Sequence, residues 1–212
     1  RLNLGGYVLA GSSFVLNRGT ANIGGASADL LTIDLTGVNL FVGVGASFSG
    51  EASTLVTGNA TGFLTTSANV SVAMAKSTAV NDTRRWTGIA ASAASMSVVG
   101  LPTDYTVEVK DLSVKYNTAS GAAGASNAVA IDWAPVISGN TSPLEGLAGD
   151  VTLTVSGLVR LNLGGYVLAA GAFTLGRSTQ SGVVLGDNGT VSIDLLTIDL
   201  TGVNLFVGVG AT

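Results

Sequence analysis

The chain has 212 residues, of which only 10% are charged, with a formal net charge of −4 and a sequence pI near 4.5. This balance excludes a nucleic-acid partner, because no basic surface could neutralise phosphates. The lack of any histidine or cysteine excludes Ser-His-Asp and Cys-His catalysis and almost every zinc or copper site.

The apolar residues are dispersed in a way that indicates strands. Mean hydropathy is high, at +0.54, yet no run approaches the roughly 18 consecutive apolar residues of a membrane helix. Valine, leucine and isoleucine are instead separated by threonine, serine, asparagine and glycine. The absence of cysteine is typical of large exported bacterial repeat proteins, which need no oxidation.

Two segments of the sequence occur twice. RLNLGGYVLA stands at residues 1–10 and 160–169, and DLLTIDLTGVNLFVGVGA at residues 29–46 and 194–211. We therefore predict one full long repeat over residues 1–159 and the first third of its next copy over residues 160–212. Because the chain begins at arginine and stops inside a repeat, we expect further copies beyond both ends. The second pair is offset by six more residues than the first, so we expect a surface loop around residues 178–189.

The alternation of apolar and polar residues slips by one position at three places. In TIDLTGVNLFV the slip falls at Gly37 and again at Gly202, and in TVEVKDLSV it falls at Asp111. A one-residue slip would turn the apolar set to the other face of a sheet. We therefore predict a β-bulge or a corner at each of these residues.

An alanine-rich window, residues 87–97, is the one stretch with a helix-like composition. Its Gly88 aligns with Gly6, Gly62 and Gly165 as the anchor of a short module that recurs in strand-like segments. We therefore predict a strand there.

Two tryptophans stand out from a chain that is poor in aromatic residues. Arg84-Arg85-Trp86 could bind a glycan or a neighbouring chain, but a loop anchored by a packed tryptophan is the favoured reading. Trp133, just before Pro135, is expected to cover the edge of a sheet.

Residues 151–169 alternate apolar and polar side chains over their whole length, which predicts a strand of unusual length. We expect Gly164 and Gly165 to bend or bulge this strand.

The carboxylates do not form a paired acid-base site. Asp29 and Asp34 are five residues apart on a predicted strand, and so are Asp194 and Asp199, which places the members of each pair on opposite faces. We expect solvated or turn-capping carboxylates.

Calcium motifs are also missing from the sequence. Neither the nonapeptide of parallel β-helices nor an EF-hand loop occurs. The turn at residues 186–189 and the loop flanked by Glu145 and Asp150 are the remaining candidates, and a plain turn is the expected structure of both. We predict no catalytic, cofactor or metal residues and no cofactor.

The fold class predicted by these patterns is all-β, an elongated tandem-repeat architecture of long strands, either stacked hairpins or solenoid-like sheets. The segments LTVSGLVRLNLGGYVLA, LTIDLTGVNLFVGVGA and VAIDWAPV resemble the repeats of very large bacterial surface or secreted proteins. The resemblance implies an exported, multi-repeat, cell-surface protein, and it transfers no site residues.

The expected function is structural, with no enzymatic activity. We expect a repeat segment of an extracellular bacterial filament or surface fibre that associates with neighbouring repeats or chains by strand pairing. The stalk of a giant surface adhesin is the alternative, and an outer-membrane β-barrel is a second one, although its aromatic girdles would require more than the 12 aromatic residues present. A two-carboxylate polysaccharide hydrolase is the enzyme alternative. We expect no nucleic-acid partner, no small-molecule substrate and no membrane partner.

Overall fold

A computed structural model describes residues 1–50, 54–137, 142–186 and 189–210. These residues form strands, turns and a single 3₁₀ turn, η1 (Pro143–Gly146), and they contain no α-helix. The prediction of an all-β fold is confirmed. Accordingly, no helix in the described part of the chain could cross a membrane.

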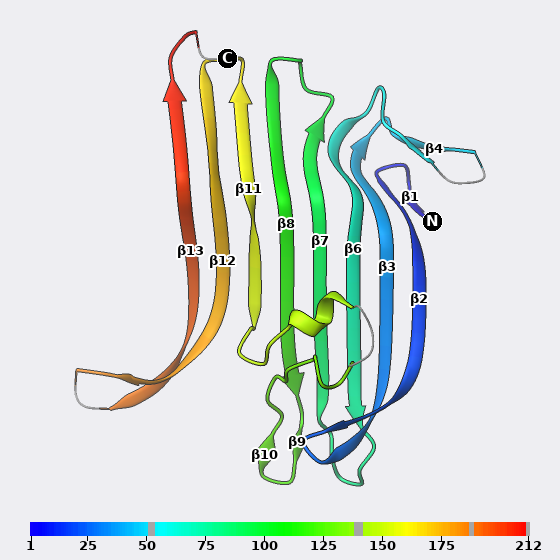
Figure 1. Cartoon of the computed structure of the whole chain (residues 1–212), viewed down its shortest axis with the longest axis vertical. Helices are drawn as coiled ribbons and strands as arrows, with labels where there is room; N and C mark the ends of the chain where they lie inside the picture. The colour runs from blue at the N-terminus through cyan, green and yellow to red at the C-terminus, as the bar shows by residue number, and fades with distance from the viewer. Residues whose placement is uncertain (51–53, 138–141, 187–188, 211–212) are drawn as a thin grey trace.

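Nine strands lie side by side in one antiparallel sheet, in the same order as in the sequence (Figure 1). They are β1 (Leu2–Leu4), β2 (Val8–Ile23), β3 (Ala26–Val44), β6 (Thr61–Ser77), β7 (Arg85–Val99), β8 (Tyr105–Ser120), β11 (Leu153–Leu163), β12 (Val167–Val184) and β13 (Thr190–Val207). Two small hairpins branch from this sheet, β4 (Ser47–Ser49) with β5 (Thr54–Val56) and β9 (Ala122–Ala123) with β10 (Ser126–Asn127). Strand β7 contains the alanine-rich window, so the prediction of a strand there is confirmed.

Three hairpin turns share one local sequence, asparagine, leucine or isoleucine, and two glycines. At the β11–β12 turn, Gly164 and Gly165 have φ of 62° and 73°, and the Gly165 N–H donates to Asn162 Oδ1 at 2.9 Å. The β1–β2 and β2–β3 turns repeat this bond at 2.8 and 3.0 Å. The expectation of one long, bent strand over residues 151–169 is therefore wrong. Two consecutive glycines at positive φ reverse the chain, because this conformation closes a tight hairpin.

Four strands of the sheet contain a bulge near their middle. Positive φ occurs at Gly37 (62°), Ser67 (55°), Asp111 (50°) and Gly202 (60°), in β3, β6, β8 and β13. The ladders shift register beside each of these residues. The predicted irregularities at Gly37, Asp111 and Gly202 are confirmed, and they are bulges within continuous strands.

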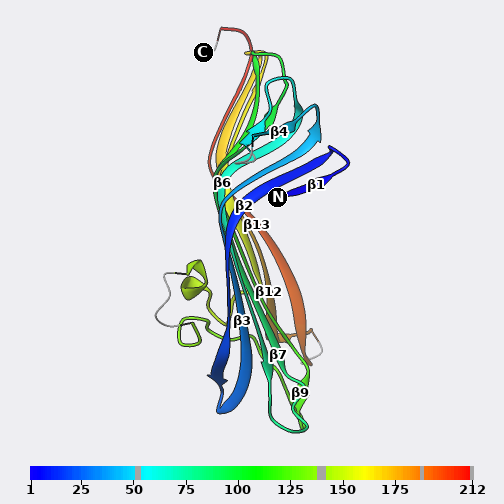
Figure 2. The ribbon, with the colours of Figure 1, turned by 90° about the vertical axis from the view of Figure 1, so that its right-hand side faces the viewer.

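The main core lies on one face of the sheet, which we call the covered face. There residues 128–137 and 142–151, which we call the covering segment, stand off the sheet (Figure 2) and pack Trp133, Leu144 and Leu147 against small strand residues. Gly88 lies under the Trp133 indole, and a Cβ there would come within 2.5 Å of its Nε1 atom. Asn117 accepts a hydrogen bond from that Nε1 at 3.1 Å. The prediction that Trp133 covers the edge of a sheet is therefore wrong. Trp133 covers a face, because the small residues of that face leave room for a large side chain.

The expected loop at residues 178–189 is only partly a loop. Residues up to Val184 belong to β12, and β13 resumes at Thr190. A register shift between Gln180 and Val183, with Gly182 at φ of 71°, takes up part of the additional length. The additional residues of the second copy therefore lengthen the β12–β13 hairpin, because extra residues can extend a ladder as well as a turn.

Candidate functional site: the β13 edge and the open face

β13 is the last strand of the sheet in Figure 1, and among the described residues no strand pairs with its outer side. Every residue of β13 is exposed. A long unpaired edge offers a row of backbone N–H and C=O groups to another strand. The edge also carries large apolar side chains, including Ile198 at 63% and Leu200 at 65% exposure.

β3 shows the same sequence in the interior of the sheet. Residues 29–44 of β3 are identical to residues 194–209, yet β3 is paired on both sides, with β2 and with β6. Phe41 in β3 is completely buried, whereas its counterpart Phe206 is 38% exposed. Phe41 packs with Leu9 and Ala60 beneath the β4–β5 hairpin. Phe206 and Leu168, the counterparts of Phe41 and Leu9, line an open hollow.

The β3–β6 ladder is fixed at its bulges by side chains that bond to the opposite backbone. Asn39 Oδ1 accepts from the Ser67 N–H at 3.2 Å, and Asn69 Oδ1 accepts from the Gly37 N–H at 3.4 Å. Each asparagine thus satisfies an N–H that a regular ladder would have paired. These contacts define the register of the two strands.

The two copies of the duplicated sequence meet in an ordinary ladder. The second copy begins at Arg160, inside β11, and Arg160 lies opposite Glu108 of β8. β11 also pairs with β12 along its whole length. The strand that carries the start of the second copy is therefore an interior strand of the sheet.

The face opposite the covered face, which we call the open face, is apolar across eight strands. Cross-strand partners share a face, and one row of them is Phe14, Leu35, Val70, Ala91, Val114, Val155, Leu175 and Ile198. The members of this row are half-buried or exposed. The adjacent row, Leu16, Ile33, Val72, Ile89, Tyr116, Leu153, Arg177 and Leu196, contains one charge.

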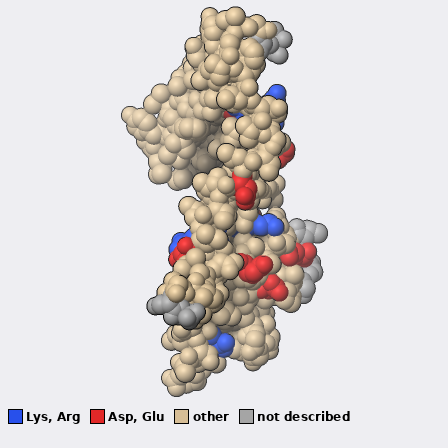
Figure 3. Space-filling view, turned by 90° about the vertical axis from the view of Figure 1, so that its left-hand side faces the viewer, with Lys and Arg blue, Asp and Glu red and all other residues tan. Residues whose placement is uncertain are grey.

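Charged groups are few, and most of the surface in Figure 3 is uncharged. Arg177 pairs with Asp194 at 2.8 Å, and this bond together with one from Thr179 lowers the pKa of the Asp194 carboxyl. Asp29 and Asp34 lie five positions apart in a continuous ladder, on opposite faces as predicted, and Asp34 accepts from Ser71 at 2.6 Å.

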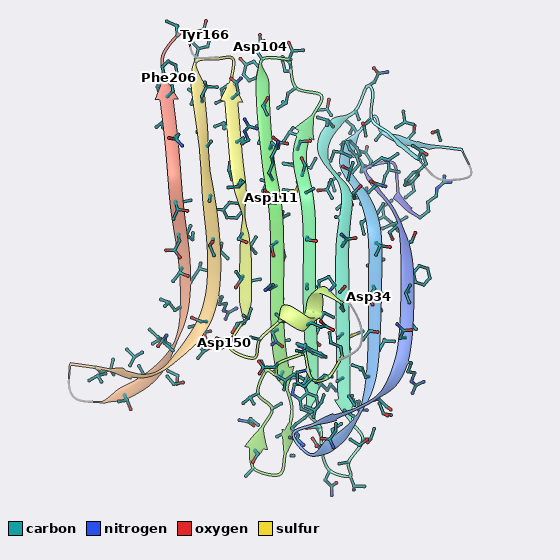
Figure 4. The ribbon with its side chains drawn as sticks, in the orientation of Figure 1. Asp34, Asp104, Asp111, Asp150, Tyr166 and Phe206 are labelled. Atoms are coloured by element: carbon teal, nitrogen blue, oxygen red, sulfur yellow. The ribbon has the colours of Figure 1, made fainter. Side chains whose placement is uncertain are left out.

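The two candidate calcium loops differ in how much of them the structure describes. Asp187 and Asn188 lie outside the described residues. Elsewhere the described chain contains no group of three or more acidic, histidine or cysteine side chains that could hold a metal ion. Asp34, Asp104, Asp111 and Asp150 are spread over the sheet and its loops (Figure 4).

The Arg84-Arg85-Trp86 cluster is anchored by a packed tryptophan, as favoured, although Trp86 lies in β7 and not in a loop. Trp86 is 2% exposed, and its Nε1 donates to the Val129 carbonyl at 3.0 Å. The Arg84 guanidinium lies 5.5 Å from the indole and bonds Asp82.

Sequence reasoning missed the two asparagines of the β3–β6 ladder. The signal was present, because Gly37-Val38-Asn39 and Ser67-Ala68-Asn69 share a pattern in which asparagine follows the bulge by two residues.

The chain matches no protein-family model, and no curated protein or solved structure shows significant similarity to it.

Proposed function

We propose that this chain is a structural repeat segment of an extracellular bacterial filament or surface fibre. In this proposal, tandem repeats build one elongated antiparallel sheet, and each repeat associates with the next by strand pairing. The partners are neighbouring repeats or chains, and the role is not catalytic.

The observation that carries the proposal is the β8–β11 ladder. It joins a strand of the first copy to the strand in which the second copy begins, without an interruption of the sheet order. Every added repeat would form the same ladder with the repeat before it. The free energy of unfolding should therefore increase with the number of repeats.

A chain extended to two full copies tests the proposal against the present chain. We expect a higher thermal midpoint, greater protease resistance and ordered association by light scattering, because the β13 edge and the hollow beside Phe206 would become covered. An extended chain that gains neither stability nor association would contradict the proposal.

The stalk of a giant adhesin is the second candidate, and the same continuous sheet favours it. The two candidates differ in the extended chain: a stalk gains stability from its second copy but stays monomeric, whereas a filament segment associates.

A further inference from the structure

We infer that the outer side of β13 binds one particular strand, that of residues 61–77 in a second copy of this chain, in the register in which β3 binds β6. The inference rests on the proposed strand-pairing function and specifies its partner. Its basis is that the structure already contains the partner bound to a copy of the same sequence.

The β13 strand has the conformation that β6 recognises in β3. Gly37 and Gly202 have φ of 62° and 60°. The inner ladders match as well, since Asp34 lies opposite Val15 in β2 and Asp199 lies opposite Thr174, the residue of β12 that is equivalent to Val15. The edge is therefore preformed, and binding requires little reorganisation of its backbone.

The polar groups of β13 at the bulge lack the partners that they have in β3. Asn39 accepts from the Ser67 N–H, but its counterpart Asn204 turns back and donates from Nδ2 to the Gly202 carbonyl at 3.0 Å. A strand that carries the Ser67-Ala68-Asn69 pattern would offer the N–H that Asn204 Oδ1 can accept and an amide oxygen for the Gly202 N–H. A strand in another register would offer neither.

The aromatic ring of the edge adds a steric requirement. In the interior copy the tip of the Phe41 ring lies over Gly43 and against Gly62 of β6, where a Cβ would come within 3.0 Å of the ring and 2.3 Å of the Val42 carbonyl oxygen. The Phe206 ring lies over Gly208 in the same way, with 3.0 Å to a Cβ built there. The incoming strand therefore needs glycine at the position of Gly62.

A second copy can supply this strand by exchange. Its β6 is held between β3 and β7, so β13 enters as β3 leaves, and β11–β13 take the place of β1–β3. The ladder that is lost and the ladder that forms have the same sequence from Asp29 and Asp194 onward. Such an exchange is heterologous, and it leads to open head-to-tail chains rather than closed dimers.

A synthetic peptide with the sequence of residues 61–77 tests the site on the intact chain, with residue-resolved amide exchange as the readout. We expect saturable binding that slows exchange along β13. Two control peptides should bind at least ~10-fold more weakly: the same peptide with Gly62→Val, and the β8 sequence of residues 105–120. Neither peptide can both leave room for the Phe206 ring and form the hydrogen bonds at the bulge.

Substitutions in the chain locate the site. Leu200→Asp should abolish peptide binding, because its counterpart Leu35 faces Val70 of β6. Val80→Asp should leave binding unchanged, since Val80 is 90% exposed in the turn after β6. Both residues are exposed, so neither substitution should disturb the fold.

The exchange itself is tested with the intact chain at rising concentration after partial thermal unfolding. We expect dimers and longer species that the 61–77 peptide suppresses. The inference is overturned if that peptide fails to bind, if all three peptides bind equally, or if the larger species form regardless of the peptide. If the chain still self-associates although the inference is overturned, the proposed strand-pairing function remains, but with a different partner strand. If the extended chain does not self-associate at all, the proposed function itself is contradicted.

Discussion

At the scale of single residues, buried polar groups hold the covering segment on the sheet. Asn117 is 1% exposed, and its amide donates to the carbonyls of Ile131 and Ala148, both at 2.9 Å, while its oxygen accepts from the Trp133 indole. All of its hydrogen-bonding atoms are thereby used, so the segment can pack without leaving a polar group unpaired.

Asp82 is a carboxylate whose bonds to neighbouring side chains depend on the fold. The Arg84 guanidinium bonds it at 2.6 Å, and the Ser77 hydroxyl bonds it at 2.7 Å. These bonds, led by that from Arg84, hold the pKa of Asp82 well below its ordinary value of 3.8. A carboxyl whose pKa is lowered in the folded state stabilises the fold above its unfolded pKa, and this stabilisation is lost as the pH falls toward the folded value.

Asp82→Asn should therefore lower the thermal midpoint at pH ~7, and the difference from the unsubstituted chain should shrink as the pH falls below ~4. Thermal unfolding at pH ~7, ~4 and ~2.5 measures this change. Asp104→Asn, in an exposed turn, is the control and should show little difference at any pH. A constant gap between Asp82→Asn and the unsubstituted chain at all three pH values would contradict the assignment.

At the scale of elements, the sheet is built from strands whose two faces meet different surroundings. In β7, Trp86, Gly88 and Ala90 are buried under the covering segment, while Thr87 and Ile89 are half-buried on the open face. This alternation shows why an alanine-rich stretch is a strand here: small residues on one face make room for the covering segment.

The bulge glycines give a prediction at the same scale. A Cβ at Gly37 or Gly202 would meet nothing within 4 Å, so the cost of a side chain there comes from positive φ alone. Gly37→Val or Gly202→Val should lower the free energy of unfolding by about 1 kcal/mol or more.

Gly19→Val is the matched control, because Gly19 is a β2 residue with equally open surroundings and no positive φ. It should be neutral or slightly stabilising, since valine favours strands. Denaturant unfolding of the three variants measures the differences, and equal effects at all three positions would show that backbone conformation at the bulges is not the cause.

At the scale of the whole molecule, one sequence occupies two environments. β3 lies inside the sheet and β13 lies at its edge. Local opening of a strand requires less free energy where one of its two ladders is missing. The difference between the two copies therefore isolates the contribution of position in the sheet from that of sequence.

We expect the amides of β13 to exchange faster than those of the identical residues in β3 by an order of magnitude or more, because ~1.4 kcal/mol in opening free energy gives a tenfold change. Residue-resolved NMR exchange measures this, since the two segments give peptides of the same mass. Equal protection of both copies would mean that the β13 edge is closed in solution.

The sequence by itself determined the all-β class, the strand at residues 87–97 and the positions of the irregularities at Gly37, Asp111 and Gly202, which the structure shows to be bulges and not corners. These features depend on local properties. The period of the apolar residues sets the strand, and the place where that period slips marks the bulge.

Only the tertiary structure decided that Gly164 and Gly165 close a hairpin, that Trp133 covers a face, and which copy of the duplicated strand lies at the edge. A bend and a hairpin share the same local signal, and they differ in whether the chain returns to pair with itself. Burial likewise depends on residues that are remote in the sequence. Phe41 and Phe206 have the same sequence neighbours, yet one is completely buried and the other is 38% exposed, because only Phe41 has β6 and the β4–β5 hairpin beside it.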